Sequence, residues 1–139
     1  MKHRYYLGID TGVNTGVAMW DKKDRRLKFV ETMPIHKAMV LLMNMTDEDL
    51  ADLHIRVEDA RKRKWFGNSG KEKLQGAGSV KRDAKIWEDF LTDIGASFEM
   101  VAPKQNKTKL DADDFKKLTG WKERCSSHAR DAAMLVFGI

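Results

Sequence analysis

Two acidic residues close hydrophobic segments that alternate in the way β-strands do. Asp10 ends the segment of residues 5–10, and Glu58 ends the segment of residues 53–58. A carboxylate next to a hydrophobic core lowers stability unless it is paired or binds a cation. If these strands are neighbours, their ends bring the two carboxylates together, and two close anions either raise the pKa of one of them or attract a divalent cation. At neutral pH the pattern favours a metal site.

The C-terminal segment supplies two further candidates. His128, Asp131 and Leu135 stand at positions i, i+3 and i+7, so they share one face of a helix, and Leu135 indicates that this face points inward. Each polar residue also has a purely structural interpretation. Asp131 would compensate the helix dipole, and His128 would be a hydrogen-bonded residue at the helix terminus. The spacing therefore makes both residues candidate ligands and leaves the structural roles open.

The elements that must position these residues follow from hydrophobic periodicity and turn residues. The segments with strand character cover residues 5–10, 17–20, 27–32, 53–58 and 97–101. Four segments have helical patterns. The first starts at Pro34, and the second is a stripe from Val80 that ends at a glycine cap, Gly95. The third runs from a cap at Asp111 through Leu118, and the fourth from a cap at Ser126 or Ser127 through Phe137. Residues 47–52 are predicted to be an acidic link, and residues 61–70 a loop. This order predicts an α/β domain with a mixed sheet packed between helices.

Length and composition limit the class of protein. The chain has 139 residues, 42% of them hydrophobic and 34% charged, which suits one soluble globular domain over residues 1–139. No stretch approaches the roughly 18 apolar residues that span a membrane, and no apolar region follows the polar start of residues 1–4. We therefore expect a cytoplasmic protein without a membrane partner. The single cysteine, Cys125, is expected to be a free thiol.

Charge favours a polyanionic partner. The chain carries 26 Lys and Arg against 21 Asp and Glu, a formal net charge of +5. Basic residues gather after Glu58, in the long helical stripe and after the fifth strand, although any one of these clusters could also be a solvated face. The candidate DNA-binding residues are Arg61, Lys62, Arg63, Lys64, Trp65, Phe66, Lys81, Arg82, Lys104, Lys107 and Lys109. Trp65 and Phe66 offer faces for stacking on unpaired bases, or they pack the loop or a dimer interface.

Together, these motifs resemble the RuvC family of Holliday-junction resolvases, particularly its short phage-type members. The matching segments are residues 7–12 and 15–18 on the opening hairpin, Val57 and Glu58, residues 103–105 with Lys107, and residues 128–133. They occur in the order found in the family and cover nearly the whole chain. The resemblance implies an RNase H-like fold with a five-stranded mixed sheet, a homodimer, and Mg²⁺- or Mn²⁺-dependent cleavage of branched DNA in recombination and repair.

The resemblance also assigns roles to the candidate residues. It implies that Asp10, Glu58 and Asp131 are the catalytic metal-binding carboxylates and that His128 occupies the fourth catalytic position, where the family has either His or an acid. The implied reaction is hydrolysis of a phosphodiester with two metal ions per active site. Asp10 would bridge the ions, Glu58 would complete one, and Asp131 with His128 would complete the other, with His128 also able to move a proton near neutral pH.

Three other functions stay open. The same fold cleaves RNA–DNA hybrids in RNase H enzymes and is attributed a role in ribosomal-RNA processing in the related YqgF family. Asp10, Thr11 and Gly12 also resemble the phosphate-binding hairpin of actin-like ATPases, which need two such domains where this chain has room for one. A non-catalytic junction-binding protein is the third alternative, and the presence of all the expected carboxylates argues against it.

Overall fold

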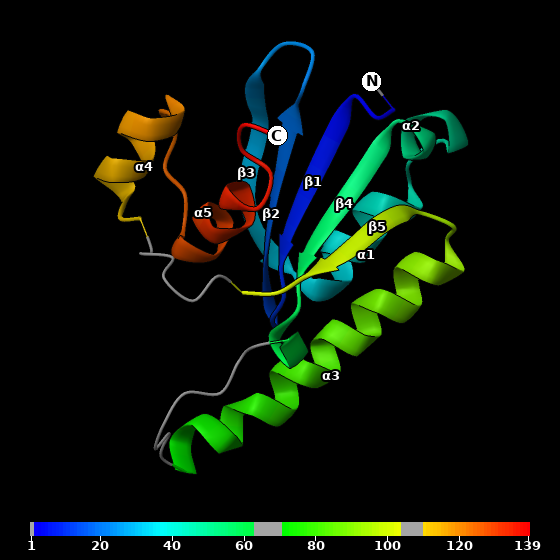
Figure 1. Ribbon diagram of the computed structural model, residues 1–139, viewed down its shortest axis with the longest axis vertical. Helices are drawn as coiled ribbons and strands as arrows, with labels where there is room; N and C mark the ends of the chain where they lie inside the picture. Colours follow the sequence, from blue (N-terminus) through cyan, green and yellow to red (C-terminus); the bar gives the residue numbers. More distant parts are fainter. Residues whose placement is uncertain (1, 63–70, 104–109) are drawn as a thin grey trace.

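The protein is described by a computed structural model that covers residues 2–62, 71–103 and 110–139. Figure 1 shows one twisted sheet with helices on both of its faces. The strands are β1 (Tyr5–Asp10), β2 (Asn14–Asp21), β3 (Arg26–Pro34), β4 (Leu53–Glu58) and β5 (Ser97–Val101). The helices are α1 (Ile35–Met43), α2 (Asp47–Ala51), α3 (Lys71–Asp93), α4 (Ala112–Thr119) and α5 (Ser127–Met134), with a 3₁₀ turn η1 (Ala60–Lys62).

β1 is the central strand of the sheet, whose order is β3-β2-β1-β4-β5. It pairs antiparallel with β2, where Asp10 lies opposite Gly16, and parallel with β4, where Ile9 lies opposite Val57. β5 continues the parallel side, with Glu58 opposite Val101. The carboxyl ends of β1 and β4 therefore lie next to each other at one edge of the sheet.

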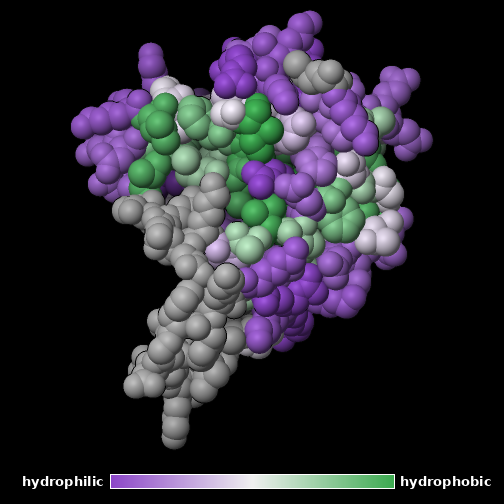
Figure 2. All heavy atoms as spheres, in the orientation of Figure 1, coloured by the Kyte–Doolittle hydropathy of each residue, from purple (hydrophilic) through white to green (hydrophobic). Residues whose placement is uncertain are grey.

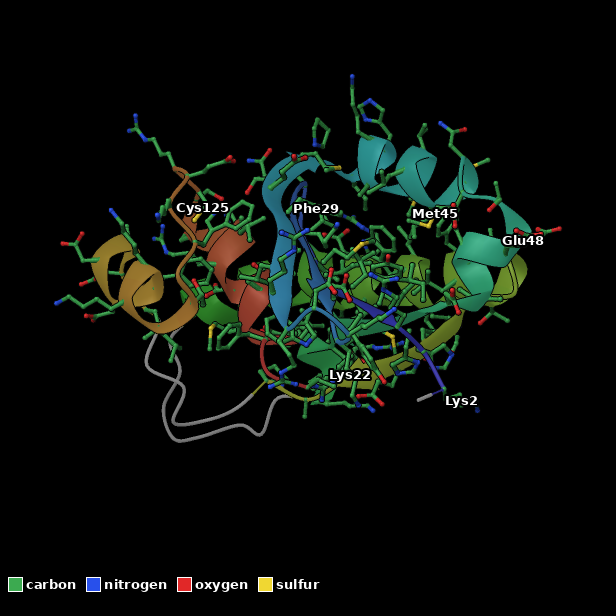
Figure 3. The ribbon with its side chains drawn as sticks, turned by 90° about the horizontal axis from the view of Figure 1, so that it is seen from above. Lys2, Lys22, Phe29, Met45, Glu48 and Cys125 are labelled. Atoms are coloured by element: carbon green, nitrogen blue, oxygen red, sulfur yellow. The ribbon has the colours of Figure 1, made fainter. Side chains whose placement is uncertain are left out.

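Two hydrophobic cores lie on opposite faces of this sheet. Alternate residues of the strands point to each face, so Leu7 and Ile9 pack with Trp87 of α3 on one side, while Ala18 packs with Phe115 of α4 and the alanines of α5 on the other. Figure 3 shows Phe29 on the side of α1 and Cys125 beside α5. Helices α1 and α3 therefore pack on one face of the sheet, and α5 packs on the other.

The second core reaches the molecular surface near the C-terminus. The partly buried apolar side chains that pack against it include Met134 at the end of α5 and Phe137 and Ile139 beyond it. In the orientation of Figure 2, hydrophobic residues form a band across the middle of the molecule, with hydrophilic residues above and below it. No helix in the described parts of the chain is long and apolar enough to cross a membrane.

Glycine lets α5 lie directly on the sheet. A Cβ atom at Gly8 of β1 would stand 2.0 Å from the carbonyl oxygen of Ala132, and one at Gly16 of β2 would stand 2.0 Å from that of His128. Neither position tolerates a side chain, because the obstructing atoms belong to the backbone of α5. The two glycines therefore set how closely the first turns of α5 approach β1 and β2.

The sequence-based predictions of the strands and of the mixed sheet are confirmed, and three element boundaries are corrected. Residues 47–51 form a short helix rather than a link, because the Thr46 side chain accepts a hydrogen bond from the Asp49 N–H and caps it. α3 begins at Lys71, well before Val80. α5 ends at Met134 rather than at Phe137, because the backbone tightens into turns from Leu135 onward.

Candidate metal centre

The candidate site begins at the end of the central strand. Asp10 is the last residue of β1, and its side chain is only 16% exposed. Its Oδ2 atom lies 3.2 Å from Nδ1 of His128 on α5. The close approach of α5 over Gly16 thus brings an imidazole to a strand end that already holds a carboxylate.

The pKa of the Asp10 carboxyl reports on its surroundings. It rises from 3.8 to about 6, first because of burial and then because of the negative charge of Glu58, while Asp131 adds a smaller effect. The hydrogen bond with His128 acts in the opposite direction. Since such interactions weaken with distance and with exposure to water, Glu58 and Asp131 each lie close enough to act on Asp10. A divalent cation among them would relieve the repulsion that they exert on Asp10.

Glu58 reaches this region from the end of β4. The parallel pairing stops at Ile9 and Val57, so Glu58 and Asp10 each stand one residue beyond it, at the same edge of the sheet. The Glu58 side chain is half-buried. The two parallel strands therefore place both carboxylates at the same edge of the sheet, as the strand-end pattern in the sequence predicts.

α5 presents His128 and Asp131 from the flank of its buried face. The helix is capped by Ser126, whose Oγ accepts from the Ala129 N–H. Its fully buried residues are Ala129, Ala132 and Ala133, whereas Asp131 is half-buried and the His128 side chain is 52% exposed. Leu135, on the same face as His128 and Asp131, is buried as expected, while the alanines lie deepest against the sheet and the two polar residues border them on the side of Asp10.

The donor atoms fit a divalent cation, although the side chains are not arranged as a finished site. In the described parts of the chain, no three His, Cys, Asp or Glu side chains form a ready metal-binding group. The carboxylates of Asp10, Glu58 and Asp131 are the hard oxygen donors that Mg²⁺ and Mn²⁺ prefer, and an imidazole suits Mn²⁺ better than Mg²⁺. Glu58 and Asp131 are both half-buried.

The predicted DNA-binding residues fall into different environments. Arg61 is paired with Asp59 and Glu88, and Lys62 donates to the carbonyl of Met100. Lys81 and Arg82 are exposed on α3, and Arg82 lies 3.9 Å from Asp83. The remaining candidates lie outside the described residues: Arg63, Lys64, Trp65, Phe66, Lys104, Lys107 and Lys109.

Sequence reasoning missed two kinds of residue that shape the site. Gly8 and Gly16 were noted only as parts of a strand and a turn, yet a glycine inside a strand is a signal for close backbone approach. Asp59 received no role, although it is 1% exposed and sits next to Glu58. Its partner Arg61 is only two residues away, so the short spacing of opposite charges was the available signal.

The fold is similar to that of a protein of known structure. The chain is similar to T. thermophilus RuvC, solved in complex with a Holliday junction substrate, with a TM-score of 0.55 and 18% sequence identity. The match covers 92% of this chain and 87% of that one. No protein-family model matches the chain, and no curated protein matches it either. The five-stranded mixed sheet with its flanking helices is thus an RNase H-like fold.

Proposed function

We propose that this protein is a divalent-metal-dependent endodeoxyribonuclease of the short, phage-type RuvC kind, which cleaves branched DNA and prefers four-way junctions. The observation that carries the proposal is that Asp10 and Glu58 end neighbouring parallel strands at one edge of the sheet, with Nδ1 of His128 3.2 Å from Oδ2 of Asp10. The raised pKa of Asp10, caused first by burial and then by the charge of Glu58, agrees with it. Acidic side chains placed near one another at a strand edge lower stability unless they bind a cation, which supports a functional role for this arrangement.

Each residue of the site has a chemical task in this proposal. Asp10, Glu58 and Asp131 would hold Mg²⁺ or Mn²⁺, and Asp10 is the carboxylate on which both of the others act. The bound ions would supply charge stabilisation at the phosphate and an activated water. His128 hydrogen-bonds Asp10 and is half exposed, so its imidazole can orient that carboxylate and exchange a proton with solvent or with the leaving oxygen.

Branched DNA is the substrate class that the remaining observations favour. The net charge of +5 suits a polyanion, and Lys62, Lys81 and Arg82 are exposed for contact with phosphates. T. thermophilus RuvC, which has a similar fold, is solved on a Holliday junction. A four-way junction has two equivalent strands to cut, so a homodimer with one site per subunit matches its symmetry.

A cleavage panel tests the proposal. Purified protein is incubated with labelled four-way junction, flap, RNA–DNA hybrid and linear duplex of related sequence, each with Mg²⁺, Mn²⁺ or EDTA. We expect the junction to be cut fastest, at paired positions on opposite strands, and only with metal. Faster cleavage of the hybrid would assign the chain to RNase H-type chemistry. Tight junction binding without cleavage in either metal would make it an architectural protein.

A further inference from the structure

The residues that follow Glu58 are fastened to β5. The backbone N–H of Asp59 donates to the carbonyl of Val101 at 2.8 Å, and Nζ of Lys62 donates to the carbonyl of Met100, also at 2.8 Å. These two bonds fix both ends of the short turn η1 against the neighbouring strand. Glu58 is thus held between a strand on one side and a tethered turn on the other.

A second connection links the same turn to α3. Nε and Nη2 of Arg61 donate to the two carboxylate oxygens of Asp59, both at 2.8 Å, and Nη1 donates to Oε1 of Glu88 at 3.3 Å. Asp59 is buried, while Arg61 and Glu88 are partly exposed. The Arg61 guanidinium therefore connects Asp59, the residue next to Glu58, to α3.

The geometry makes this connection stiff. A guanidinium that binds a carboxylate with two parallel hydrogen bonds fixes its plane as well as its distance, which an ammonium group does not. Asp59 is buried, so losing its partner would leave an uncompensated charge inside the protein. Three of the five N–H donors of the Arg61 side chain are committed to these two carboxylates, and this favours a structural task for it.

We propose that Arg61 is a positioning residue for the candidate metal centre. Through Asp59 it fixes the Glu58 carboxylate relative to Asp10, and through Glu88 it makes that position depend on α3. The inference rests on the proposed function in one respect, because it takes Glu58 to be a metal ligand. It goes beyond that function in two ways. The ion pairs of Asp59, Arg61 and Glu88 support metal binding, and Arg61 has a structural role instead of contacting DNA.

The test compares two variants of the network with a matched control. Arg61→Gln breaks both pairs, and Glu88→Gln breaks only the pair on α3, at a distance from the metal site. Lys37→Gln is the control, because it removes one positive charge at an exposed position of α1, outside this network. Each protein is assayed for Mn²⁺ affinity by calorimetry, for junction affinity in EDTA, and for the single-turnover cleavage rate at saturating junction.

We expect Arg61→Gln to weaken Mn²⁺ binding about tenfold or more and to slow cleavage similarly, the size of effect seen for residues that orient metal ligands. Glu88→Gln should act in the same direction but less strongly, with junction affinity retained. Lys37→Gln should leave the metal affinity, the junction affinity and the rate at saturation unchanged. Arg61→Lys, which keeps the charge, should recover only part of the metal affinity and guards against a folding defect.

Two results would overturn the inference. One is an Arg61→Gln protein with weaker junction binding and normal metal affinity, because Arg61 would then be a phosphate contact. The other is normal metal affinity and rate in both network variants. If the wild type neither binds Mn²⁺ nor cleaves, the proposed function fails instead. Hydrogen exchange of the Asp59 amide then decides the inference: faster exchange in Arg61→Gln and Glu88→Gln supports the link, and unchanged exchange rejects it.

Discussion

The Cα of Gly16 faces the carbonyl oxygen of His128 so closely that a Cβ on the glycine would come within 2.0 Å of it. Gly16 also lies opposite Asp10 in the β1–β2 pairing. One backbone contact therefore connects the strand that pairs with Asp10 to the helix that carries His128. The 3.2 Å contact between His128 and Asp10 depends on this missing side chain.

Gly16→Ala is expected to separate these two side chains. The added methyl meets backbone atoms, so α5 must shift, at a cost of about 1–3 kcal/mol of stability for an overpacked position. Because His128 and Asp131 move with α5, metal binding and junction cleavage should fall more than stability alone explains. Urea unfolding and single-turnover cleavage measured on the same preparation check this. A variant with wild-type cleavage would show that the position of α5 does not govern the site.

Gly78→Ala is the matched control. Gly78 lies in α3, is exposed, and a Cβ placed there meets nothing within 4 Å. Replacing a helical glycine by alanine stabilises a helix by about 0.5–1 kcal/mol. We expect this variant to unfold at slightly higher urea concentration with unchanged cleavage. The contrast between the two variants separates the loss of glycine as such from the close approach at Gly16.

The strands that hold the site were predictable because their signal is local. The alternation of residues 5–10 and 53–58 is read directly from the sequence, and the structure places β1 and β4 at those bounds, side by side. The cap of α2 was equally local, since Thr46 and Asp49 have capping spacing, and reading the acidic run as a link overlooked it.

Other features depend on contacts between distant segments and were not predictable in the same way. Leu135 predicts the buried face of α5, but the sequence does not show that Gly8 and Gly16 let the backbone at Ala132 and His128 approach the sheet. Arg61 resembled a phosphate contact in a basic run, whereas its partner Glu88 lies 27 residues away on α3. Periodicity gives the face of a helix, and only tertiary packing gives its exact rotation and its partners.

Asp10→Asn is expected to stabilise the metal-free protein at neutral pH. Asp10 is an acid whose folded-state pKa is raised, to about 6 from 3.8, so the unfolded chain loses its proton first and folding stability falls as pH rises through this window. Above pH 6 the whole penalty is present. The neutral amide avoids it, which amounts to about 1–3 kcal/mol. Urea unfolding in EDTA at pH 4 and at pH 7.5 should show a difference only at the higher pH.

Added metal should make the wild type more stable than Asp10→Asn. A cation that binds only the folded wild type stabilises it by mass action, and a variant without the central carboxylate gains less. We therefore expect Mg²⁺ or Mn²⁺ to raise the unfolding midpoint of the wild type but barely that of Asp10→Asn, which also keeps junction binding and loses cleavage. Undiminished cleavage by Asp10→Asn would remove this residue from the mechanism.

Asp21 controls acid stability away from the site. Its carboxylate is fully buried, accepts from Nε and Nη2 of Arg4 and from the N–H groups of Lys23 and Asp24, and these bonds lower its pKa to about 2, with Arg4 the main cause. A depressed pKa contributes stability above about pH 4, and that contribution is lost as pH falls through about 2.

Asp21→Asn should therefore cost about 1.5–3 kcal/mol at pH 7, the range for hydrogen bonds to a charged group. Asp24→Asn is the control, since Asp24 is 44% exposed and lies 3.6 Å from Arg4, where an ion pair contributes little. Urea unfolding at pH 7, 4 and 2 should show the gap between wild type and Asp21→Asn closing only in the most acidic samples. A gap that stays constant down to pH 2 would mean that side-chain shape, not charge, makes Asp21 important.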